Sequence, residues 1–70
     1  MNWDQVEGNW MQVKGKVKQQ WGKLTDDDIA RINGKRDELL GLLQQRYGYA
    51  KEQAQNEVDN WIKIQKSLAA

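Results

Sequence analysis

The sequence predicts an all-α protein, a small four-helix array built as two pseudo-duplicated helical hairpins that pack roughly orthogonally. Large apolar residues recur every three or four positions along most of the 70 residues, which is the period of an α-helix. No segment shows the polar and apolar alternation of a strand. Glycines recur every seven residues in each half of the chain, which indicates two related hairpins: Gly8, Gly15 and Gly22, then Gly34, Gly41 and Gly48.

The first helix is expected from about Asp4 to Trp21. Its apolar stripe is narrow and continues into the following link; it comprises Trp3, Val6, Trp10, Val13, Val17, Trp21 and Leu24. A glycine inside a helix costs about 1 kcal/mol relative to alanine, so Gly8 and Gly15 indicate either a close backbone approach or a frayed start. Gly22 follows Trp21 as the residue that ends the helix.

The second helix is short and begins at a strong capping signal. Thr25 is a good N-cap and Asp28 lies three residues later, which is an acidic form of the capping box. The carboxylates of Asp26, Asp27 and Asp28 also suit the positive end of the helix dipole. We expect this helix to end at Asn33 and Gly34.

The third helix is expected from about Lys35 to Tyr47, where Gly48 ends it, and the fourth from about Ala50 to Lys66. Leu42 lies off the inner stripe of the third helix and is expected to be partly exposed. Residues 67–70 are expected to fray. The residues predicted to form the core are Trp10, Val13, Val17, Trp21, Leu39, Leu43, Tyr47, Val58 and Trp61.

The composition excludes several classes of site. Cysteine and histidine are absent, so there is no disulfide, no thiolate nucleophile and no imidazole for proton transfer. The net charge of +1 is far from the basic balance of a dedicated nucleic-acid binder. The mean hydropathy is −0.98, no apolar run reaches the roughly 20 residues of a membrane span, and MNWDQVEGNW shows no secretory signal. We therefore expect one soluble cytoplasmic domain over residues 1–70.

Several strings resemble the CsbD-like family of small bacterial general-stress proteins. They include WGKLTDDD at residues 21–28 and RYGY at residues 46–49, and the resemblance covers about residues 2–61. It implies a compact array of four helices grouped with folds of two orthogonal hairpins. It also implies a soluble protein induced by general stress or in stationary phase. The molecular activity of the family is not established, so the resemblance supplies no catalytic residues.

The acidic run Asp26, Asp27 and Asp28 admits two interpretations. Three carboxylates could contribute to a site for a hard cation. However, adjacent helical side chains point about 100° apart and do not converge, and there is no second acidic cluster. Helix capping explains the run without a ligand, so we expect no metal and no cofactor.

Two surfaces are candidates for binding. The local basic cluster Lys14, Lys16, Lys18 and Lys23 could follow a phosphate backbone, but a solvated polar face is the preferred interpretation because Asp26 to Asp28 follow it. The tryptophans could stack on bases, but all of them lie on apolar stripes and are needed as core volume.

The function expected from the sequence is therefore non-enzymatic. One hypothesis is a protective stress protein that acts under osmotic or desiccation stress. The other is a helical binding module that docks a protein or nucleic acid through the basic face from Lys14 to Lys23. We expect a monomer with no small-molecule substrate and no membrane contact, and nucleic acid is not the favoured partner. The partner itself is unknown.

Overall fold

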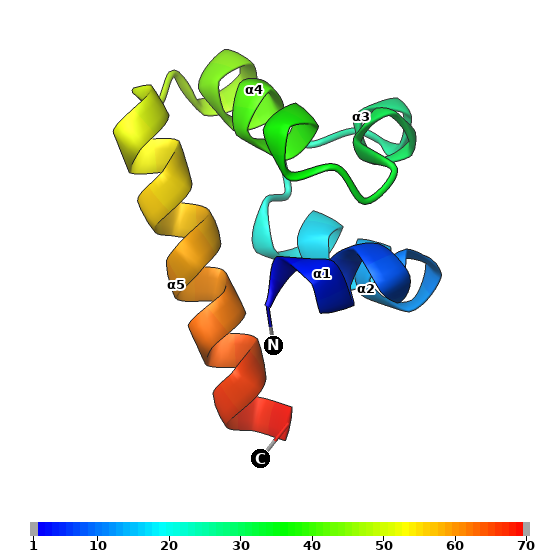
Figure 1. The fold of residues 1–70 in the computed structure, drawn as a ribbon. Helices are drawn as coiled ribbons and strands as arrows, with labels where there is room; N and C mark the ends of the chain where they lie inside the picture. The colour runs from blue at the N-terminus through cyan, green and yellow to red at the C-terminus, as the bar shows by residue number, and fades with distance from the viewer. Residues whose placement is uncertain (1, 70) are drawn as a thin grey trace.

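The computed structural model describes residues 2–69, and the side chains of residues 2–64. All regular elements in the described part of the chain are helices, which confirms the predicted all-α class. In order they are α1 (Trp3–Gly8), α2 (Trp10–Gln20), α3 (Asp26–Ile32), α4 (Arg36–Tyr47) and α5 (Lys51–Ala69). Helix α4 packs against α5 on one side and α3 on the other, and α2 contacts both α1 and α3 (Figure 1).

The expected first helix is divided into α1 and α2, so the described residues form five helices and not four. The break lies at Asn9, whose backbone (φ −114°, ψ 28°) leaves the helical region. Its side chain donates to the carbonyl of Gln5 at 3.1 Å and its backbone N–H donates to the same carbonyl. Because only one residue is irregular, the three-and-four spacing of the apolar stripe continues across the break and conceals it in the sequence.

The core extends through all five helices. Each residue of the predicted core except Tyr47 is buried, and Tyr47 is half-buried against them. The rings of Trp21 and Trp61 meet at the centre with their centroids 5.6 Å apart. The expectation for Leu42 is wrong, since only 2% of this residue is exposed. Helix α4 lies between α3 and α5, so it buries more than one face and needs no single stripe.

The turns use left-handed residues at two places. Asn33 (φ 43°) and Gly34 (φ 82°) join α3 to α4, and Gly48 (φ 71°) ends α4. A Cβ atom on Gly34 would lie 3.3 Å from the Cα of Glu7, so the turn between α3 and α4 approaches the backbone of α1 closely at this glycine. Of the two interpretations of Gly8 and Gly15, a close approach is not found, because a Cβ there meets nothing within 4 Å.

The remaining expectations for the helix ends and for the arrangement of the helices have different outcomes. Gly22 follows Trp21, the C-cap of α2, but its φ is not positive, so it does not supply a left-handed end to that helix. Helix α5 continues to Ala69, beyond the expected end at Lys66. Fraying of residues 67–70 stays a prediction, and Ala70 lies outside the described residues. The pseudo-duplicated, orthogonal arrangement of two hairpins also stays a prediction.

Candidate functional site

The N-terminus of α3 is held by reciprocal hydrogen bonds. The backbone N–H of Asp28 donates to the hydroxyl of Thr25 at 3.1 Å, and the N–H of Thr25 donates to the Asp28 carboxylate at 3.1 Å. This capping box satisfies two backbone donors that the first turn of a helix would otherwise leave unpaired. It also directs the Asp28 side chain inward, where only 2% of the residue is exposed.

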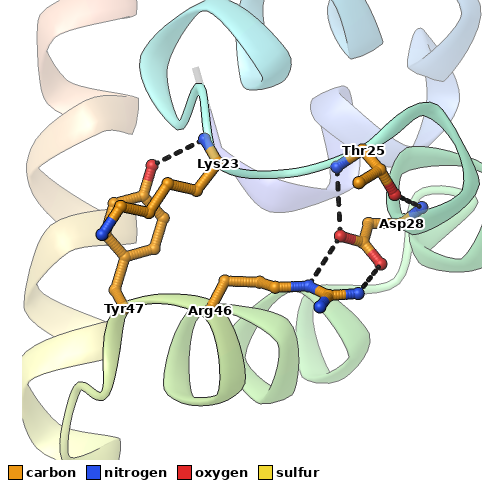
Figure 2. A network of polar contacts seen from close by, with 5 residues as sticks. All are labelled: Lys23, Thr25, Asp28, Arg46 and Tyr47. Atoms are coloured by element: carbon orange, nitrogen blue, oxygen red, sulfur yellow. Dashed lines mark hydrogen bonds and ion pairs between the residues drawn. The ribbon is translucent and has the colours of Figure 1, made fainter.

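Arg46 on α4 completes the surroundings of this buried carboxylate. Its Nε and Nη2 atoms each donate to one oxygen of Asp28 at 2.9 Å, which is a bidentate ion pair (Figure 2). The guanidinium of Arg46 first, and the N–H of Thr25 second, lower the pKa of Asp28 to about 2. Asp28 is therefore ionised at neutral pH with both oxygens engaged, which suits a structural anion and not a proton acceptor.

The next residue of α4 holds the link between α2 and α3. The hydroxyl of Tyr47 accepts a hydrogen bond from the backbone N–H of Lys23 at 3.2 Å (Figure 2). The Lys23 ammonium lies 5.1 Å from the centre of the Tyr47 ring, within range of a cation–π interaction. The ring of Tyr49 stacks on the ring of Tyr47, and their centroids are 5.2 Å apart. The last turn of α4 thus binds both the link and the cap of α3.

The structure separates the predicted basic cluster into different surroundings. Lys18 forms an ion pair with Asp26 across α2 and α3, and this contact lowers the pKa of Asp26. Lys14 is half-buried on the same side of α2, Lys16 is exposed and lies elsewhere, and Lys23 lies over Tyr47. Only Lys14 and Lys18 therefore share one surface.

That surface is a groove of about 420 Å³ between α2 and α3, which we call the α2–α3 groove. It is lined by Trp10, Met11, Lys14, Gly15, Lys18, Asp26, Ile29, Ala30 and Asn33. This groove was not predicted from the sequence, although a signal was present. Met11, Lys14 and Lys18 lie three and four residues apart, so they share one helix face away from the core stripe.

The other candidate sites are largely occupied by structural roles. Trp10, Trp21 and Trp61 are buried, and Trp3 donates its indole N–H to the carbonyl of Gly34 at 2.9 Å. Within the described residues, no three His, Cys, Asp or Glu side chains are grouped to hold a metal ion. No helix in this part of the chain is long and apolar enough to cross a membrane.

These features define a small all-helical protein in which the buried carboxylate of Asp28 stabilises the fold. The chain belongs to the CsbD-like family, whose model matches residues 4–56. It is 65% identical to the UPF0337 protein YjbJ of Escherichia coli O6:H1, over 90% of this chain and 91% of that protein. It is 64% identical to the UPF0337 protein ECA0631 of Pectobacterium atrosepticum, over 87% and 88%. It is 59% identical to the UPF0337 protein RPA4217 of Rhodopseudomonas palustris, over 89% and 94%. The family comprises general stress-response proteins without a characterised molecular activity.

Proposed function

We propose that this chain is a non-enzymatic, soluble and cytoplasmic stress protein that protects the cell under osmotic or desiccation stress, and that it acts as a monomer. The observation that carries the proposal is the state of Asp28, the buried charged residue of the described core. Its oxygens are occupied by Arg46 and Thr25. Burial makes Asp28 the side chain most suited to acid–base chemistry, but its contacts with Arg46 and Thr25 use it to stabilise the fold.

The surface supports a protective role. The mean hydropathy is −0.98, and charged residues make up 30% of the chain. In the described part of the chain, Met11 and Ile64 are the large hydrophobic residues that are exposed. Such a surface is well hydrated and offers few apolar side chains for association at high concentration, which are properties that an abundant protectant needs.

Survival of a deletion strain tests this proposal. We expect lower survival than wild type after drying or osmotic shock, with recovery when the gene is restored. A Trp21→Ala gene at matched protein level, in which the core is broken, separates a role of the fold from a role of composition. Unchanged survival of the deletion strain under both stresses would contradict the proposal.

The second candidate is a binding module that docks a protein or nucleic acid through the basic face. It is favoured by the composition of α2, which carries three lysines and no acidic residue. For nucleic acid we expect a gel shift at about 50 mM salt that weakens steeply as salt rises. Charge reversal at Lys14 and Lys18 would abolish the shift, whereas reversal at Lys35 and Lys51, outside this face, would not. Absence of a shift at low salt removes the nucleic-acid form of this candidate.

A further inference from the structure

The α2–α3 groove combines an apolar floor with a basic rim. Met11 is 75% exposed, the most exposed of the large apolar residues described, and Ile29 and Trp10 lie beside it in the lining. Gly15 adds no side chain between them, and a Cβ atom there would meet nothing within 4 Å. We propose that this groove binds a free aliphatic carboxylate of medium chain length, with its tail on Met11 and Ile29 and its carboxylate at Lys14.

The size of the groove favours a small ligand over a protein. Its volume of about 420 Å³ lies within the range of roughly 300–1,000 Å³ that is typical of small-molecule pockets. A stable protein interface needs about 800 Å² on each partner. That area is about a sixth of the 4666 Å² accessible surface of the whole chain, far more than one groove between two short helices provides.

The charges of the rim favour an anionic head group. The groove is lined by Lys14, Lys18 and Asp26, which together leave one positive charge. Asp26 is paired with Lys18 and interacts with the charge of Lys14 only at longer range. Lys14 is half-buried, unlike the other described lysines, and no ion pair within 4 Å is described for it. A carboxylate near its Nζ atom gains a charge-assisted hydrogen bond with a donor whose stem lies along the groove.

Octanoate is a suitable probe, with octanol as the neutral ligand of the same tail and acetate as the head group alone. We expect octanoate to cause saturable shifts in amide nuclear magnetic resonance spectra, concentrated at Met11, Gly15, Ile29 and Ala30. Octanol should bind about fivefold more weakly than octanoate, because it lacks the charged hydrogen bond with the partly exposed Lys14. Acetate should cause no clustered shifts.

Two pairs of variants separate the groove from general effects. Lys14→Gln should reduce octanoate affinity about fivefold and make octanoate and octanol nearly equal, while Lys16→Gln, with the same charge change, should leave both affinities unchanged. Gly15→Leu should fill the groove and reduce binding at least about tenfold. Gly41→Leu, at another helical glycine whose Cβ would meet nothing within 4 Å, should leave it intact. Circular dichroism establishes that each variant is folded.

Several outcomes would overturn the proposal. They are the absence of saturable shifts with octanoate, equal losses for Lys14→Gln and Lys16→Gln, and binding that Gly15→Leu does not affect. Shifts at the groove with phosphatidylglycerol vesicles or an acidic helical peptide, but not with octanoate, would assign it to a membrane or a protein instead.

Discussion

The two short helices α1 and α3 begin in the same way but are held very differently. Each starts with a capping box, from Asn2 and Gln5 in α1 and from Thr25 and Asp28 in α3. Helix α3 buries three residues and is tied to α4 through Arg46. Helix α1 buries only Val6 among its residues, and one described side-chain hydrogen bond, from Trp3 to Gly34, joins it to a distant part of the chain. Caps decide where a helix begins, whereas tertiary contacts decide how firmly it is held.

The largest effect is expected at the centre of the core, where the C-cap of α2 packs against α5. Trp21→Ala removes a side chain that packs on Trp61, at a cost of about 3–5 kcal/mol. The total free energy of unfolding for a chain of this length is roughly 3 to 10 kcal/mol. We therefore expect Trp21→Ala to be largely unfolded, as measured by far-ultraviolet circular dichroism. Native helicity and an unchanged urea midpoint would contradict this.

Breaking the ion pair of α3 should lower stability next most strongly. Asp28→Asn removes the charge that Arg46 pairs with and weakens the cap, so the urea midpoint should fall. A double-mutant cycle with Arg46→Gln should show that the two effects are not additive. The matched control is Asp27→Asn, at the exposed neighbour in the same first turn, which should change the midpoint far less. Additive losses would show that the pair contributes nothing.

The acid dependence of stability tests the same carboxylate. The pKa of Asp28 is lowered from 3.8 to about 2 in the folded protein, so the unfolded chain binds its proton first as pH falls. The contribution of this group is present above about pH 4 and is lost as pH falls through about 2. Urea unfolding across this pH range should show that acid lowers the free energy of unfolding less for Asp28→Asn than for wild type. Identical slopes would contradict the lowered pKa.

A smaller effect is expected where α1 meets the turn between α3 and α4. Gly34→Ala forces a side chain into a left-handed conformation, at a cost of about 1–2 kcal/mol, and directs its Cβ to 3.3 Å from the backbone of Glu7. The thermal midpoint should fall. Gly15→Ala, at an open helical site, should raise the midpoint and serves as the control.

The smallest effect is expected for Trp3→Phe, which keeps an aromatic ring but removes its N–H donor to Gly34. The cost is about 0.5–1.5 kcal/mol. We expect hydrogen exchange to accelerate in α1 while α3 and α4 keep their protection, because α1 buries one residue and is joined to a distant part of the chain by one described side-chain hydrogen bond. Equal acceleration in all helices would show that α1 is part of the cooperative core.

Local chemistry made much of the fold predictable. Thr25 and Asp28 form the expected cap because the pattern needs only four consecutive residues, and Gly48 ends α4 for the same reason. The cap at Asn2 and Gln5 has a comparable sequence pattern but was not predicted. Of the candidate site, spacing along α2 predicts that Lys14 and Lys18 share a face. It does not predict that α3 forms the opposite wall of a groove.

The sequence by itself determined the all-helical class and the apolar stripes that supply much of the core, since both follow from helical periodicity and from the need to bury indole and aliphatic surface. Only the structure showed the break at Asn9, where Asn9 bonds locally to Gln5. Only the tertiary structure decided the burial of Leu42 and the choice of Arg46 as the partner of Asp28, because both depend on residues far apart in the chain that meet when α4 packs between α3 and α5. Local propensity carries no information about such contacts.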